Sequence, residues 1–290
     1  MNVNIGVIGG GFVGKATSLF ECPMNNVIIY DTEPSKCYPN ADITLDSMKD
    51  RDVIFVAVPT PAKESGECHT GIVDIVLNGL RKVVNEKRTH IVVRSTVPVG
   101  FSRSRDVMFM PEFLTEKRWR EDFISCRNWV IGTLEGKYDR NAKFMNVMNK
   151  MIYNAHFANV IKHNSMSFID TSEAEAVKYF RNNFLAAKVG IFNEFSEFCS
   201  VKGLNYGRVS RIVTLDKRIG EDHTLVPGHD GMKGFGGTCL PKDLNSMIYQ
   251  MEGSGIKAPI LKAVKRRNVE IDRVAKDWEA DVGRAYVGNV

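Results

Sequence analysis

A glycine-rich turn between a buried strand and a helix is the feature that most constrains the fold of this chain. Residues 4–8 form a short apolar run, and residues 9–14 follow it with the spacing G-x-G-x-x-G. Helical periodicity continues over residues 12–20, and a second apolar run over 27–30 ends at Asp31. This order is typical of dinucleotide-binding βαβ units, in which the pyrophosphate lies at the helix N-terminus and the acid binds the adenosine ribose. The alternative is a glycine-rich turn that holds no ligand.

The same unit predicts a cofactor and the residues that hold it. The carboxylate of Asp31 favours NAD over NADP, because it would repel a 2′-phosphate. Lys36 is a second candidate for a ribose contact, with an exposed surface lysine as the alternative. The strand expected over 52–58 runs into Pro59 and Thr60, which should face the cofactor because ligands of such sheets bind at the carboxyl ends of strands. The expected NAD site comprises Gly9, Gly11, Phe12, Val13, Gly14, Asp31, Lys36, Pro59, Thr60 and Thr96.

Alternating strands and helices continue through the first half of the chain. Further buried strands are expected at residues 90–94, 106–110 and 128–132, with helices at 72–84 and 139–152. Such alternation predicts an α/β fold with a doubly wound parallel sheet of the Rossmann type. We place this NAD-binding domain at residues 1–165.

The pattern then becomes helical. A capping-box signature at residues 172–175 opens a helix that continues to about Val201, which is long for a globular protein. Lys178 and Asn182 lie four residues apart, hence on one face of it. Apolar residues occur on more than one face, which predicts a homodimer packed through residues 172–201. Shorter helices are expected at 206–213, 243–251 and 259–280, so residues 166–290 should form a helical substrate and dimerisation domain.

A cysteine in a second glycine-rich stretch is the main candidate for chemistry. Residues 234–243 read Gly-Phe-Gly-Gly-Thr-Cys-Leu-Pro-Lys-Asp, so Lys242 and Asp243 closely follow Cys239. Adjacent glycines let the backbone approach a ligand closely, and the helical run that follows predicts that Cys239 lies at or just before a helix N-terminus. The positive helix end and a nearby ammonium would favour the nucleophilic thiolate. The alternative is a small buried hydrophobic residue.

Composition and charge exclude several other classes of function. The formal net charge of +5 is spread along the sequence, which suits an anionic small molecule and predicts no nucleic-acid partner. The six cysteines show no C-x-x-C spacing, so neither a metal site nor a disulfide framework is expected. The first strand begins by Asn4 and no apolar run reaches membrane-spanning length. We therefore expect no signal peptide, no membrane association and a cytoplasmic location.

Seven blocks of this sequence, taken in order, match one family. They are residues 9–14, 59–61, 95–100, 111–114, 178–186, 218–220 and 234–243. With these blocks the chain resembles the nucleotide-sugar dehydrogenases that oxidise the C6 alcohol of a sugar to a carboxylate, and the UDP-glucose 6-dehydrogenases fit best. The resemblance covers nearly the whole chain, and its last block is the most specific.

The resemblance implies which residues perform catalysis. They are Cys239, Lys178, Asn182, Asp243, Glu112 and Thr96. Two NAD molecules would oxidise UDP-glucose to UDP-glucuronate, and Cys239 would trap the intermediate aldehyde as a thiohemiacetal that is oxidised to a thioester. Lys178 and Asn182 would stabilise the charge that develops at the reacting carbon, and Asp243 would orient or activate water. Thr96 and Glu112 would take part in acid–base steps through bound water.

The resemblance also implies where the substrate binds. The substrate site would comprise Glu112, Phe113, Leu114, Lys178, Asn182, Arg218, Phe235, Gly236 and Gly237, with Arg218 reaching into the site of the partner subunit. Three features depart from the family pattern. The spans 31–53 and 100–110 are short where a helix is expected, and a third domain that helps to hold the nucleotide has no counterpart in these 290 residues. We therefore expect the family's redox chemistry with weak nucleotide-sugar binding.

Two other functions remain open at this stage. A β-hydroxyacid dehydrogenase of the related two-domain type has about this length and uses a lysine on its long helix, but it needs no cysteine after a Gly-Gly pair. A non-catalytic NAD-binding partner of a complete enzyme is the second alternative, and only the missing third domain favours it.

Overall fold

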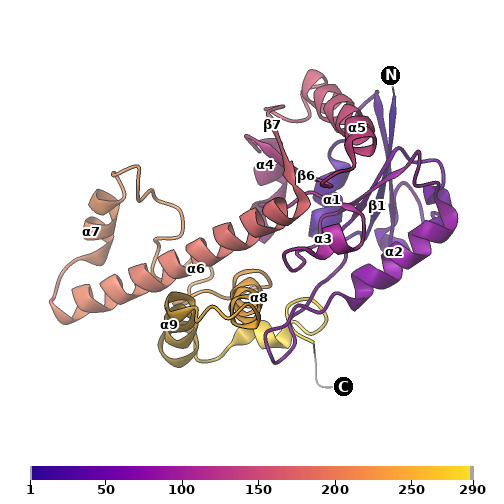
Figure 1. Cartoon of the computed structure of the whole chain (residues 1–290). Coiled ribbons are helices and arrows are strands. Elements are labelled where there is room, and N and C mark those ends of the chain that lie inside the picture. Colours follow the sequence, from indigo (N-terminus) through magenta and orange to yellow (C-terminus); the bar gives the residue numbers. More distant parts are fainter. Residues whose placement is uncertain (1, 288–290) are drawn as a thin grey trace. The chain divides into compact units, whose positions relative to one another are not determined.

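The computed structural model describes residues 2–287, which form two compact units (Figure 1). The first unit consists of the residues up to Thr60 together with Thr70–Lys178, and the second of Pro61–His69 together with the residues from Tyr179 onward. The domain boundary predicted after residue 165 falls directly before a strand that belongs to the sheet of the first unit.

The first unit is built on one seven-stranded sheet with the order β2-β1-β3-β4-β5-β6-β7. The strands are β1 (Val3–Ile8), β2 (Asn25–Tyr30), β3 (Val53–Val56), β4 (His90–Val93), β5 (Met108–Phe109), β6 (Trp129–Thr133) and β7 (Met166–Asp170). Neighbouring strands are parallel except β5 and β6, which pair antiparallel. The predicted Rossmann-type fold is confirmed, with a sheet that is mostly rather than wholly parallel. Strand β7 was not predicted.

Helices cover both faces of this sheet. Side chains alternate between the two faces along each strand, so the buried apolar strands contribute to a core on each face. On β3, Val53 and Phe55 enter one core cluster, and Ile54 and Val56 enter another. The first cluster also receives buried residues from α1 (Phe12–Ser18), α4 (Trp119–Ile124) and α5 (Tyr138–Phe157). The second receives them from α2 (Gly71–Val83) and the one-turn helix α3 (Phe101–Ser104). The strands β1, β3 and β4 thus lie in a sheet that is covered on both faces, and their carboxyl ends lie at one edge of this sheet.

The connection between β2 and β3 contains two short 3-10 turns, Pro34–Lys36 and Leu45–Met48. No α-helix occurs between residues 31 and 53 of the described chain, in agreement with the short span noted in the sequence. The second short span, between residues 100 and 110, holds α3, a helix of four residues.

In the second unit, helices α6 (Thr171–Val201), α8 (Leu240–Gly253) and α9 (Pro259–Arg267) surround a small core. The long helix α6 starts in the first unit and continues through the second, with the length predicted from the sequence. Helices α8 and α9 pack near it, and α7 (Tyr206–Val213) follows α6 along the chain. The core consists of Ala186, Phe235, Leu244 and Ile248, with Val189, Leu240, Leu261 and Val264 packed against them.

Two features of the second unit differ from the expectations. The helix predicted over 259–280 is wrong beyond Asp272: α9 passes into a π-helical turn (Asn268–Asp272), and Lys276 adopts a positive φ of 46° before a 3-10 turn (Asp277–Ala280). Residues 61–69 also join this unit, since the Ala62 N–H donates to the Ala285 carbonyl at 3.0 Å and the Val287 N–H donates to the Ala62 carbonyl at 2.9 Å. Among residues 2–287, no helix combines the length and apolar character needed to cross a membrane.

Candidate active site

The glycine-rich turn after β1 has a backbone that only glycine permits. Gly9 has a φ of +101°, and a Cβ at Gly14 would overlap the carbonyl oxygen of Gly9. Gly11 is the N-cap residue of α1, and the space around its missing Cβ is open. The turn therefore leaves the start of α1 accessible to a ligand, which suits the pyrophosphate of a dinucleotide.

Asp31 follows β2 and contacts the glycine-rich turn directly. Its Oδ2 accepts the N–H of Gly10 at 2.6 Å, and its Oδ1 accepts the N–H of Glu33 at 2.9 Å. Lys36 forms an exposed ion pair with Glu33, and its backbone carbonyl fills the position that a Cβ at Gly10 would take. A carboxylate next to the turn at the end of β2 fits the ribose end of NAD, while the contact of Lys36 with a ribose stays a prediction.

Two further predicted cofactor residues lie at the carboxyl ends of β3 and β4. Thr60, which follows Pro59 after β3, is buried, and so is Thr96, which follows β4. Ser95 connects these two strand ends, because its hydroxyl donates to the Val58 carbonyl at 2.6 Å. The two turns that were expected to face the cofactor are thus held together by a hydrogen bond of the first unit.

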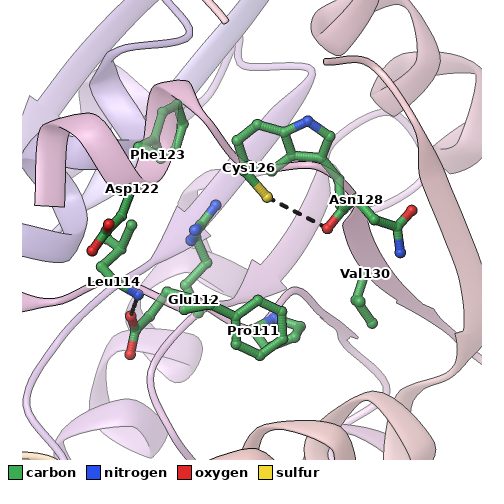
Figure 2. A pocket seen from close by; sticks show the side chains of 11 residues that line it. Pro111, Glu112, Leu114, Asp122, Phe123, Cys126, Asn128 and Val130 are labelled. Carbon is green, nitrogen blue, oxygen red and sulfur yellow. Dashed lines mark hydrogen bonds between the residues drawn. The ribbon is translucent and has the colours of Figure 1, made fainter. Parts of the chain in front are cut away.

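A buried ion pair joins Glu112 and Lys178 in the first unit. The Lys178 ammonium donates to Glu112 Oε1 at 2.5 Å and to the Glu112 carbonyl at 2.9 Å, and both side chains are about 5% exposed. The N–H of Leu114 donates to the other carboxylate oxygen at 2.8 Å (Figure 2). Burial alone would raise the pKa of Glu112, but Lys178, the Leu114 N–H and the nearby Arg94 hold it below its usual value. Glu112 is therefore an ionised, buried carboxylate.

Arg94 is a buried cation that the sequence analysis did not select. It lines a cavity of about 20 Å³ together with Glu112, Phe113 and Leu114. Its guanidinium lies 5.8 Å from the ring centroid of Phe55. Burial lowers the pKa of Arg94 to about 10, against the opposing effect of Glu112. The sequence signal for this residue was an arginine at the end of an otherwise apolar strand. A buried arginine rarely lacks a partner of opposite charge, so this position predicts a nearby carboxylate.

A second group of polar residues surrounds Cys239 in the second unit. Cys239 is the N-cap residue of α8, as predicted, and Asp243 lies in the first turn of that helix. The Asp243 carboxylate is 1% exposed and accepts hydrogen bonds from Asn182 Nδ2 at 2.5 Å and Lys242 Nζ at 2.5 Å. Burial lowers the pKa of Lys242, but the neighbouring Asp243, Cys239 and Cys68 raise it above its usual value. A permanent cation therefore lies in this group.

The loop that leads to Cys239 is closely held. Phe235 is buried in the core of the second unit, and Gly237 has a positive φ of 69°. The Thr238 hydroxyl lies 3.8 Å from the Cys239 sulfur. The predicted substrate residues Phe235, Gly236 and Gly237 thus directly precede Thr238 and Cys239, and residues 237–239 form a turn.

Arg218 is an exposed residue of the second unit. Its side chain is 89% exposed and forms an ion pair with Asp216, with Nη2 and Oδ2 2.5 Å apart. The ammonium of Lys188 on α6 donates to the carbonyls of Ile219 and Gly220 at 2.8 and 3.0 Å, which fixes the turn that follows Arg218. The contact of Arg218 with the substrate of a partner subunit stays a prediction.

The structure therefore contains two groups of predicted catalytic residues. Glu112 and Lys178 form one group in the first unit, where Thr96 also lies. Asn182, Asp243 and Cys239 form the other group in the second unit, which also includes Lys242. Sequence reasoning noted Lys242 as an ammonium near the thiol but did not predict its pairing with Asp243.

Comparison with known proteins places this geometry in a family. A model described as the NAD binding domain of the UDP-glucose/GDP-mannose dehydrogenase family matches residues 39–156, and the central-domain model of the same family matches residues 172–270. The chain belongs to the UDP-glucose/GDP-mannose dehydrogenase family. The resemblance seen in the sequence is thereby confirmed. The first match begins at residue 39 and does not include the glycine-rich turn. The assignment of this turn to cofactor binding therefore depends on its backbone geometry.

Individual relatives agree with this family. The chain is 30% identical to a UDP-glucose 6-dehydrogenase of Rickettsia felis over 82% of its own length and 53% of that protein. It is 32% identical to a putative UDP-glucose 6-dehydrogenase of Bacillus subtilis over 77% of its length and 51% of that protein. The chain thus spans about half the length of the curated relatives it matches. The solved UDP-glucose dehydrogenase of Pyrobaculum islandicum superposes with a TM-score of 0.76 at 26% identity, covering 92% of this chain and 68% of that one.

A second solved structure bears on the alternative dehydrogenase class. A 3-hydroxyisobutyrate dehydrogenase of Mycobacterium tuberculosis superposes with a TM-score of 0.68, covering 99% of this chain and 97% of that one. Its sequence identity is 14%, so this likeness shows a shared fold alone. The family models that match this chain are those of the UDP-glucose/GDP-mannose dehydrogenases. NAD is the cofactor that the family's NAD-binding domain and the residues of the glycine-rich turn both indicate.

Proposed function

We propose that the chain oxidises the C6 alcohol of a nucleotide sugar to a carboxylate, with UDP-glucose as the first candidate substrate and UDP-glucuronate as the product. The observation that carries this proposal is the position of Cys239 at the N-cap of α8, with Asp243 held by Asn182 and Lys242 one turn later. Oxidation of an alcohol to an aldehyde needs no thiol, whereas oxidation of an aldehyde to an acid is accelerated by a covalent thioester. Bound NAD would accept the hydride in each oxidation.

The residues around Cys239 fit the steps that this chemistry requires. The Cys239 thiolate would attack the aldehyde carbon and form a C–S bond, which gives a thiohemiacetal. After the second oxidation, water would attack the thioester, the C–S bond would break, and the thiolate would leave. Asn182 and Lys242 hold the Asp243 carboxylate in one orientation, so Asp243 can accept a hydrogen bond from the attacking water. Lys242 compensates the charge of the buried carboxylate.

The ion pair in the first unit supports the first oxidation. We propose that Lys178 stabilises the oxyanion that develops on the sugar oxygen, since a preorganised cation stabilises such charge more strongly when it is shielded from water. Glu112, kept ionised by its surroundings, would accept the alcohol proton through a water molecule together with Thr96.

We further propose that the chain acts as a homodimer. Six aromatic or aliphatic side chains on the second-unit part of α6 are at least half exposed, namely Phe180, Phe184, Ile191, Phe195, Phe198 and Val201. Contiguous apolar surface of this kind is typical of protein–protein interfaces. A second copy packed against α6 would cover these residues and allow Arg218 to reach the partner's substrate.

The six cysteines form no disulfide, which fits a reducing compartment such as the cytoplasm.

The stoichiometry of NADH formation tests the proposed function. With UDP-glucose as the limiting substrate, we expect two NADH for each UDP-glucuronate formed. A single NADH per substrate with a 3-hydroxy acid, insensitive to Cys239→Ala, would identify a β-hydroxyacid dehydrogenase instead. Binding of NAD without turnover on any nucleotide sugar would favour the non-catalytic partner.

A further inference from the structure

We infer that Asn268 and Arg273 are positioning residues that fix the Cys239 loop, and that the structure around the nucleophile is completed by the segment after α9. This inference rests on the proposed function of Cys239. It concerns residues 268–277, which lie outside every block that carried the resemblance.

Asn268 binds the backbone of Phe235 through both ends of its amide. Its Oδ1 accepts the Phe235 N–H at 2.8 Å, and its Nδ2 donates to the Phe235 carbonyl at 2.9 Å. Asn268 is 2% exposed, so these bonds are shielded from water. Only a side chain that presents a donor and an acceptor together can make both bonds, and a primary amide does so in one plane. This amide pair fixes the orientation of the Phe235 peptide units.

Arg273 closes the next position of the loop. A Cβ at Gly236 would lie less than 3.0 Å from the guanidinium of Arg273. The guanidinium is 4% exposed and is held by Asp230 at 2.7 Å and by Asp277, whose two oxygens lie 2.5 and 2.7 Å away. Because its charge is satisfied by these carboxylates, Arg273 acts as a fixed surface against which the backbone of residue 236 lies.

A third side chain holds the start of the loop. Asn193 of α6 accepts the Gly234 N–H at 3.1 Å, and its Nδ2 donates to the Val189 carbonyl of the same helix at 2.9 Å. Residues 234, 235 and 236 are thus each held by a different side chain. Cys239 lies between this fixed segment and the first turn of α8, where the Asp243 N–H donates to the Cys239 carbonyl at 3.0 Å. The backbone is therefore held at residues 234–236 before the thiol and at the start of α8 after it.

This arrangement has a consequence for the covalent steps. A displacement of about 1 Å at a reacting atom can cost on the order of 10²-fold in rate. Loss of the Asn268 amide should therefore slow capture of the aldehyde by Cys239, while NAD binding in the first unit should not change. An aldehyde that is not captured would be released into solution. The expected signature is released aldehyde, together with a lower kcat.

The test compares three variants of the full chain. Asn268→Ala removes both bonds, and Asn268→Asp keeps the shape but, when ionised, only the acceptor. Glu270→Gln is the matched control, because Glu270 is exposed on the same π-helical turn. We expect a 10- to 100-fold lower kcat with UDP-glucose for Asn268→Ala, and aldehyde captured as its oxime by an aminooxy reagent. Glu270→Gln should behave as the parent does.

The aspartate variant separates positioning from general stability. A protonated carboxyl group carries one donor and one acceptor, as the amide does. The kcat of Asn268→Asp, divided by that of the parent at the same pH, should therefore rise as the pH is lowered. If Asn268→Ala does not fold, the pH dependence of Asn268→Asp alone tests whether Asn268 positions the loop. A ratio that stays constant with pH, or a folded Asn268→Ala variant with the parent's kcat and no released aldehyde, would overturn the inference.

Hydrogen exchange distinguishes failure of this inference from failure of the proposed function. Amide exchange in a peptide that covers residues 234–239 reports the loop without any substrate. Suppose that exchange is faster in Asn268→Ala than in the parent, and that the parent forms no NADH. This result would support the inference that Asn268 holds the loop and would refute the proposed function. Unchanged exchange in a parent that makes two NADH per product would refute the inference alone.

Discussion

The Glu175 carboxylate of α6 accepts the backbone N–H of Gly100 at 2.6 Å. The N–H of Ser102 donates to the other oxygen at 2.8 Å, so Glu175 binds the start of α3 and the turn that carries Thr96. Glu175 is fully buried. Burial raises its pKa to about 7, although the hydrogen bonds from Ser102 and Gly100 act in the opposite direction. One carboxylate thus connects the long helix to the turn after β4.

This raised pKa predicts a pH dependence of stability. The folded state binds a proton on Glu175 up to about pH 7, whereas the unfolded state releases it near its usual value of 4.5. The free energy of unfolding should therefore fall as the pH rises between these values, by at most about 3 kcal/mol. Denaturant unfolding at pH 5, 6, 7 and 8 should show this slope in the parent and a flatter one in Glu175→Gln. The exposed Glu173→Gln should keep the parent's slope.

Cys239 should be required for the acid product. We expect Cys239→Ala to reduce UDP-glucuronate formation by at least 10³-fold, on the order of effects seen when a catalytic nucleophile is removed. Cys239→Ser should accumulate a covalent ester, because the alkoxide is a poorer leaving group than the thiolate. Product analysis and intact-protein mass measure both outcomes. Acid formation by Cys239→Ala at the parent's rate would contradict the mechanism.

Asp31 should determine the choice of cofactor. Removal of its carboxylate in Asp31→Ala takes away the expected partner of the ribose hydroxyl and also the acceptor of the Gly10 N–H. We expect the ratio of NAD to NADP affinity to fall by roughly tenfold, which corresponds to about 1.4 kcal/mol. Titration calorimetry with both cofactors measures the ratio. A parent protein that binds NADP as tightly as NAD would refute this assignment.

The buried pair of Lys178 and Glu112 should behave as a coupled unit. Lys178→Met leaves the Glu112 carboxylate buried without its closest cation, which should destabilise the protein by about 3–5 kcal/mol. Combining it with Glu112→Gln should recover part of that loss. A double-mutant cycle by chemical denaturation measures the coupling. Additive effects of the two substitutions would show that the pair does not interact in solution.

The exposed phenylalanines of α6 should mediate dimer formation. Phe184 is 67% and Phe195 is 52% exposed, and a charge at either position would be costly to bury in an interface. We expect Phe184→Glu to shift the parent dimer to a monomer by light scattering, without loss of the folded state. Tyr153→Glu on α5 is the matched control for an exposed aromatic residue outside α6. A monomeric parent with full activity would exclude this proposal.

The sequence indicated the local motifs of the site well, because each depends on neighbouring residues. The glycine spacing of residues 9–14 requires a positive φ and close packing at fixed positions, and Pro241 and Asp243 mark the start of the helix after Cys239. The length of α6 followed from its periodicity. These features are encoded within one or a few turns of chain.

The features that were not predicted depend on contacts distant in sequence. Strand β7 has only partly buried residues, so it lacks a clear apolar run, and it is defined by its pairing with β6. The helix expected to reach residue 280 ends early, and Asn268 and Arg273 there bind a loop more than 30 residues away. Arg94 lies at the end of a predicted strand, and only the fold places it beside Glu112. No local pattern encodes such partners.

The support of the Cys239 loop by residues 268–277 has a consequence for biosynthesis. The ribosome makes the chain from its N-terminus, so Cys239 is added to the chain before Asn268, Arg273 and Asp277. During that interval the β1–α1 turn can already fold, whereas Cys239 lacks the side chains that hold its loop. The Cys239 loop thus acquires its conformation late in translation, and a nascent chain stalled before Asp277 would lack part of the support of this loop.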